Sequence, residues 1–133
     1  MSAKLDTLSE NLQKHFGDKI KSLKLALGEI TLEVGAADYL GVMTALRDEA
    51  DFRFEEMVDL CGVDYSTYGD GAWQGLRYAV VVHLLSVAKN VRLRVRVFAD
   101  DDSFPSVDSV MGIWSTANWF EREAFDLIGI VFP

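Results

Sequence analysis

Residues 118–130 read Asn-Trp-Phe-Glu-Arg-Glu-Ala-Phe-Asp-Leu-Ile-Gly-Ile, a stretch that carries signals for both ends of a short helix. Asn118 has the side chain of a good N-cap, and Glu121 three residues later completes a capping-box pattern. Gly129 can adopt the left-handed conformation in which many helices end. We therefore predict one short, doubly capped helix across this stretch.

The two sides of the predicted helix differ in character. Its core side is an apolar stripe at helical spacing, made of Phe120, Ala124, Leu127 and Ile128. The other side carries three consecutive charges that fan over roughly 200°. This side is either a solvated face, with Arg122 paired to Asp126 four residues later, or a docking surface, since Trp, Phe and Arg often anchor protein interfaces. The candidate interface residues are Trp119, Glu121, Arg122, Glu123, Phe125 and Asp126.

The composition is that of one acidic globular domain. The 133 residues are half hydrophobic and about a quarter charged, and 13 basic against 21 acidic residues give a net charge of −8. This charge disfavours nucleic acid or an anionic membrane surface as the main partner. A single cysteine cannot form an internal disulfide. No signal peptide is evident, and no apolar run approaches the length of a membrane span.

The remaining pattern alternates helices and strands. We expect helices at 5–16, where Gly17 ends the stripe, and at 36–48, with Leu40, Met43 and Leu46 toward the core. Period-two patterns predict strands, and a short helical piece follows Pro105. The expected strands lie at 20–27, 29–34, 53–61, 76–86 and 91–97, with a polar, glycine-rich loop at 66–75 and the short helical piece at 105–113.

This order predicts an α+β fold: a two-layer sandwich in which helices pack on one face of a mixed, mostly antiparallel five-stranded sheet. We see no internal repeat and no domain boundary, so residues 1–133 are expected to form a single domain.

The strand at 91–97 places Arg92, Arg94 and Arg96 on one face, each about 6.6–6.8 Å from the next. One interpretation pairs them across the sheet with Glu55 and Asp59. The other is a basic strip that meets an acidic partner or RNA. These strands interleave arginine with aliphatic residues and lack the exposed aromatics on which sheets stack RNA bases, which argues against RNA.

Few residues offer catalytic chemistry. Cys61 would be a nucleophile only with His83 beside it and a carboxylate behind; a lone cysteine is more often a small buried hydrophobe, and His83 a satisfied core or interface histidine. The two histidines and one cysteine do not supply a zinc or iron–sulfur site, and no phosphate-binding glycine motif is present. We predict no catalytic, cofactor-binding or metal-binding residue on this chain.

Several segments resemble one family. Glu-Arg-Glu-Ala-Phe-Asp-Leu-Ile-Gly-Ile-Val-Phe at 121–132, with Pro-Ser-Val at 105–107 upstream, is similar to the 30-kDa subunit of the proton-pumping NADH:quinone oxidoreductase, respiratory complex I. Residues 57–65 and the arginine-bearing strand fit the same family more loosely.

The resemblance implies a structural subunit of the peripheral arm that packs against the large subunit at the quinone site, here called the quinone-site subunit, and against neighbouring subunits. FMN and iron–sulfur clusters would belong to other subunits, and electron transfer from NADH to quinone, coupled to proton translocation, to the assembly. The implied location is the cytoplasmic side of the bacterial inner membrane, without direct insertion. The family's C-terminal extension is absent from this chain, and we expect the chain to be the α/β domain of a longer protein.

Two other classes stay open. One is a free-standing ferredoxin-like binding module for RNA or a regulatory protein. The other is a small thiol enzyme built around Cys61, whose thiol would then need a lowered pKa.

Overall fold

Helix α1 (Ala3–Phe16) opens the chain in the computed structural model, and its buried side carries Leu8, Leu12 and Phe16. The structure describes residues 3–67 and 75–133. The three buried side chains recur at intervals of four, so one stripe of the helix enters the core. The predicted helix that ends at Gly17 is confirmed.

A hairpin and a second helix follow. Strands β1 (Ile20–Ala26) and β2 (Glu29–Val34) pair antiparallel, and α2 spans Ala36–Asp48, which confirms the predicted elements. Leu40 is exposed on α2, contrary to expectation, because the helix buries the side that carries its aromatic residue. That buried side consists of Tyr39, Val42, Met43 and Leu46.

The next three strands are β3 (Glu56–Asp64), β4 (Tyr78–Ser86) and β5 (Val91–Phe98). Strand β3 starts three residues later than predicted, because the turn after α2 extends through Arg53, whose φ is 49°. The predicted loop at 66–75 falls mostly on residues 68–74, which lie outside the described residues.

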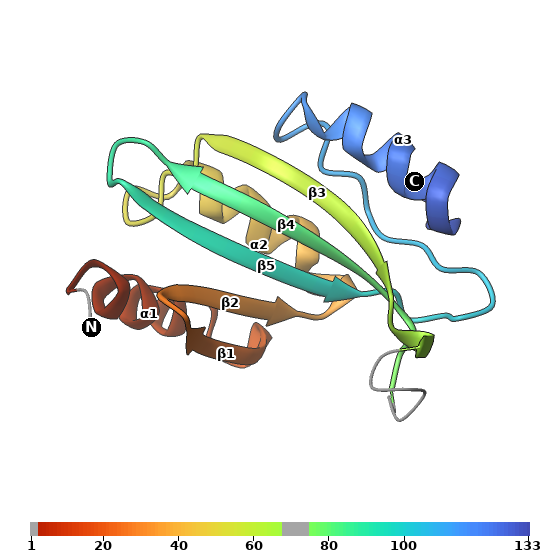
Figure 1. The fold of residues 1–133 in the computed structure, drawn as a ribbon. Coiled ribbons are helices and arrows are strands. Elements are labelled where there is room, and N and C mark those ends of the chain that lie inside the picture. The colour runs from red at the N-terminus through yellow and green to blue at the C-terminus, as the bar shows by residue number, and fades with distance from the viewer. Residues whose placement is uncertain (1–2, 68–74) are drawn as a thin grey trace.

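The sheet has the order β1-β2-β5-β4-β3. Every neighbouring pair is antiparallel except β2 and β5, which run parallel. Figure 1 shows α2 crossing behind the sheet, and the buried side chains of α1 and α2 join one core with the inner face of the strands. The predicted α+β fold with a mixed, mostly antiparallel five-stranded sheet is therefore confirmed.

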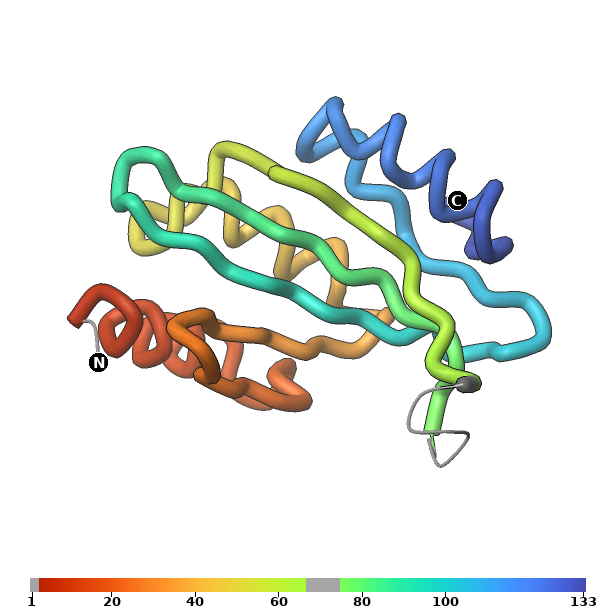
Figure 2. The backbone as a smooth tube through the Cα atoms, in the orientation of Figure 1, coloured from red at the N-terminus to blue at the C-terminus, as the bar shows by residue number. Residues whose placement is uncertain are grey.

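Residues 105–111, here called the strap, do not form the predicted short helix. The Val107 N–H donates to the Val131 carbonyl at 3.0 Å and the Val131 N–H donates to the Pro105 carbonyl at 2.9 Å. The strap is thus extended alongside the end of the chain, and only a turn at 111–113 follows it. Figure 2 shows the chain leaving β5 and doubling back before it reaches α3 (Ala117–Ile128).

Candidate functional site

Helix α3 begins one residue before the predicted N-cap. Ala117 is its first residue, and neither Thr116, at the N-cap position, nor a capping box closes its start with a side chain. The capping-box prediction was wrong because the carboxylate of Glu121 is used elsewhere. The predicted end is confirmed: Gly129 is left-handed, with φ 80°, and its N–H donates to the Phe125 carbonyl at 2.9 Å.

The inner side of α3 rests on strand β3 at a glycine. A Cβ atom on Gly62 would lie 2.5 Å from Ile128 Cδ1 and 3.2 Å from Ile130 Cδ1, so only glycine allows this close approach. Ala117 and Ala124 are also buried, whereas Leu127 is 74% exposed. The predicted core stripe therefore misplaced Leu127, which points to solvent.

Glu121 occupies the inward position instead. Its side chain accepts hydrogen bonds from the Ser109 hydroxyl at 2.6 Å and from the Val110 N–H at 2.8 Å, and the residue is 6% exposed. Burial raises the pKa of Glu121, while these two hydrogen bonds act in the opposite direction. Glu121 thus ties α3 to the strap, which corrects the expectation that it belongs to an exposed docking surface.

The outward side of α3 presents large apolar groups around charges. Trp119 is 67% exposed and Phe125 is 53% exposed. Arg122 lies between them and lines two shallow grooves, one with Trp119 and Leu127 and one with Phe125 and Met111 of the turn. We call this surface the α3 outer face. Its residues are Trp119, Arg122, Glu123, Phe125, Asp126 and Leu127.

The solvated-face interpretation relied on an ion pair between Arg122 and Asp126. In the described part of the chain, no ion pair joins them. An exposed Trp and Phe within one turn of this Arg match the composition of interface anchors. Sequence reasoning missed Leu127 and Met111 for this surface, because helical periodicity does not by itself fix which apolar residues face inward.

The three arginines of β5 differ in their partners. Arg96 Nη2 lies 2.8 Å from Glu33 Oε1 on β2, and Arg94 Nη1 donates to Thr31 Oγ1 at 3.4 Å. Arg92 is exposed, and within residues 3–67 and 75–133 neither it nor Arg94 forms an ion pair.

The expected pairing of the arginines with Glu55 and Asp59 was wrong. Strand β5 lies between β2 and β4, so β3 is not its neighbour. The Glu55 carboxylate instead accepts the Val87 N–H, and Asp59 Oδ1 lies 2.8 Å from His83 Nδ1. The arginine strip is therefore only partly satisfied by acids of its own chain.

Cys61 is exposed on β3, contrary to the expectation of a buried thiol. His83 is half-buried and hydrogen-bonded to Asp59, as expected for a satisfied histidine. Burial and the nearby Asp59 and Glu123 carboxylates raise the pKa of Cys61, against the opposing effect of Arg94. A raised pKa disfavours the thiolate that a thiol enzyme needs.

One ion pair was not predicted. Arg77 donates to both carboxylate oxygens of Asp64, at 2.9 and 2.8 Å, and the Ser66 N–H donates to Asp64 at 2.9 Å. The Arg77 guanidinium holds the pKa of Asp64 well below its usual range. The pair clamps the ends of β3 and β4; because Asp64 and Arg77 are thirteen residues apart, only the hairpin reveals it.

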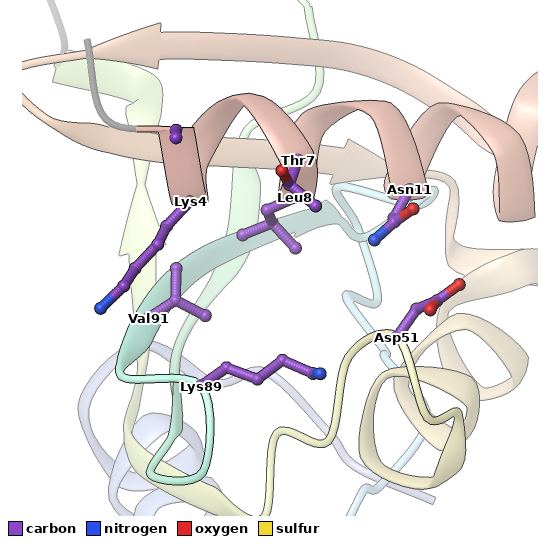
Figure 3. A pocket seen from close by; sticks show the side chains of 8 residues that line it. Lys4, Thr7, Leu8, Asn11, Asp51, Lys89 and Val91 are labelled. Atoms are coloured by element: carbon purple, nitrogen blue, oxygen red, sulfur yellow. The ribbon is translucent and has the colours of Figure 1, made fainter.

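A groove of about 380 Å³ separates α1 from the β4–β5 turn. Figure 3 shows Thr7 and Asn11 on the helix above Asp51 and Lys89. Asp51 is already held by His15 at 3.0 Å. Among the described residues, no cluster of His, Cys, Asp or Glu is suited to hold a metal ion. In that same part of the chain, no helix is both long and apolar enough to span a bilayer.

Residues 32–133 match the family model described as "Respiratory-chain NADH dehydrogenase, 30 Kd subunit". Over 132 residues the chain is 79% identical to the corresponding NADH-quinone oxidoreductase subunit of Dechloromonas aromatica (strain RCB) and 61% identical to that of Ralstonia nicotianae. In both comparisons the match covers 99% of this chain but 66% of the relative.

Two solved structures are similar. One is "Nqo5 of the trypsin-resistant fragment (1-134)", with 28% identity, a TM-score of 0.81 and 95% of each chain covered. The other belongs to the membrane-bound sulfane sulfur reductase, an archaeal respiratory membrane complex, with a TM-score of 0.75. At 18% identity, covering 98% of this chain and 71% of the other, the second likeness concerns the fold.

Proposed function

Because this chain belongs to the family of the 30-kDa subunit of the respiratory-chain NADH dehydrogenase, we propose that it serves as the α/β domain of that subunit in NADH:quinone oxidoreductase. In this role the chain holds no catalytic group. FMN and iron–sulfur clusters on other subunits carry electrons from NADH to quinone, coupled to proton translocation. The chain acts in the peripheral arm, on the cytoplasmic side of the bacterial inner membrane.

We further propose that the α3 outer face docks on the quinone-site subunit. The observation that carries this proposal is the exposure of Trp119, Phe125 and Leu127 around Arg122 on one helix. Three large apolar side chains on a single short helix are costly to leave in water, at about 25 cal/mol per Å² of apolar surface. A partner that covers them recovers this free energy.

The first test is charge reversal at the centre of this face. We expect Arg122→Glu to leave the isolated chain folded, because Arg122 has no ion pair in the described part of the chain. In the full-length protein it should weaken co-purification with the quinone-site subunit at least tenfold. Lys14→Glu, an exposed charge reversal on α1, is the matched control and should co-purify as the wild type does.

The second test removes the aromatic anchor. Trp119→Ala should cost about 2 kcal/mol or more of binding to the quinone-site subunit if Trp119 is a hot spot. Leu40→Ala, which truncates an exposed leucine on α2, is its control. If Arg122→Glu unfolds the isolated chain, or if both α3 variants co-purify normally with the quinone-site subunit, the docking proposal is wrong.

A further inference from the structure

The sheet has a second face, opposite α2, which we call the open face. In the described part of the chain no helix crosses it, and in Figure 1 it looks toward the viewer. Arg92, Arg94 and Arg96 project from β5 onto this face, because they alternate with the buried Leu93, Val95 and Val97. The open face is thus distinct from the α3 outer face.

Strand register places a row of polar side chains across the middle of the open face. Lys24 pairs with Thr31, Thr31 with Arg94, Arg94 with His83, and His83 with Asp59. The carboxylate at the far end of the row is engaged by His83 at 2.8 Å. Within the described residues, neither Lys24 nor Arg94 has a carboxylate partner.

The adjacent row shows what a satisfied position looks like. There Arg96 meets Glu33 at 2.8 Å and packs its guanidinium over the Phe98 ring at 5.4 Å. Arg94, two residues earlier on the same strand, has only the 3.4 Å contact with the Thr31 hydroxyl. In a chain with net charge −8, half-buried Arg94 therefore lacks the anion that its neighbour has.

We propose that the open face binds an extended, acidic segment of a neighbouring subunit, with carboxylates over Arg94 and Arg92. The inference rests on the proposed function, since it needs an assembly to supply the segment. Alternate residues of an extended chain are about 6.6–6.8 Å apart, which is also the spacing of alternate arginines on β5. Carboxylates on every second residue of the segment would therefore meet successive arginines, and guanidinium groups suit bidentate carboxylate binding.

Cys61 offers a probe for this surface, because it is exposed and shares the open face with Arg96 through the register Cys61–Val81–Arg96. The experiment measures the rate at which a maleimide labels Cys61 in the full-length protein, any other cysteine being replaced by serine. Rates are compared between the isolated protein and the complex purified through a tag on another subunit.

We expect labelling to be at least tenfold slower in the complex. Arg94→Glu should restore the rate toward that of the isolated protein, whereas Lys14→Glu, on α1, should not. A maleimide–diazirine cross-linker on Cys61 should then capture a peptide of another subunit that contains at least two Asp or Glu residues.

Two results would overturn the inference while leaving the proposed function intact: Cys61 labelling at the same rate in the complex, or cross-links to a peptide without acidic residues, to RNA or to a second copy of this chain. If the chain is absent from the purified complex, the proposed function itself fails, and the inference fails with it.

Discussion

The carboxylate of Glu121 holds two donors from the strap, the Ser109 hydroxyl and the Val110 N–H. Glu121→Ala would leave the Val110 N–H buried without a partner, which costs about 1–3 kcal/mol of unfolding free energy. Glu121→Gln should cost less, because its amide oxygen still accepts one bond. Urea denaturation of the isolated chain measures both effects.

Glu123→Ala on the same helix is the control for this experiment, because Glu123 is exposed. We expect its effect to stay within about 0.5 kcal/mol. If Glu121→Ala is as mild as Glu123→Ala, the strap is held by other contacts and Glu121 is not its anchor.

Asp64 should make the stability of the chain depend on pH. Because Arg77 lowers the pKa of Asp64 in the folded state, the ionised carboxylate stabilises the fold above its unfolded pKa, about 3.9, and this stabilisation is lost as the pH falls through the folded pKa.

Asp64→Asn should therefore cost up to about 1 kcal/mol at pH 7, since solvent screens a side chain that is 28% exposed. The difference from the wild type should shrink as the pH falls from about 5 toward 2. Thermal unfolding across this range measures it, and a difference that is independent of pH would contradict the assignment.

At the scale of elements, the contact between α3 and β3 depends on Gly62. Gly62→Ala would push a methyl group into Ile128 and Ile130, and we expect a loss of about 1–3 kcal/mol from this overpacking. Gly41→Ala on α2 is the matched control, because a Cβ there meets no atom within 4 Å.

The control should stabilise the chain by up to about 1 kcal/mol, because alanine favours a helix over glycine. Urea denaturation distinguishes the two variants by the sign of the change. A Gly62→Ala variant that is as stable as the wild type would show that α3 can move away from β3 at little cost.

The sequence predicts elements well where the pattern is local. The strict alternation at 91–97 and the cap at Gly129 are set by near neighbours, and both are confirmed. The strap was mispredicted because its hydrogen-bond partners, near Val131, are more than twenty residues away. The orientation of α3 failed at Glu121 and Leu127 for the same reason: the buried carboxylate is stabilised by donors that the helix itself does not contain.

At the scale of the whole molecule, the layer arrangement followed from the sequence but the strand order did not. The parallel pairing of β2 with β5 places Glu33, and not Asp59, beside Arg96. Such a pairing joins segments about sixty residues apart, and single-sequence patterns carry no information about it. The identity of charged neighbours on the open face therefore required the structure.

A single core also makes the molecule one cooperative unit. The buried cluster includes side chains of α1, of α2, of four strands and of the strap, so no part can lose its packing alone. Leu12 lies in α1, far along the sequence from Trp114, which is buried and donates to the Phe54 carbonyl at 3.1 Å.

Leu12→Ala should remove about 2–5 kcal/mol of unfolding free energy, as expected for truncating a fully buried leucine. Because the core is shared, tryptophan fluorescence, with Trp114 as its buried reporter, and far-UV circular dichroism should shift by the same amount and give coincident transitions. Two separate transitions, with fluorescence unchanged, would instead mean that α1 unfolds independently. The sheet, strap and α3 would then be a separate folding unit, onto which α1 docks as an accessory helix.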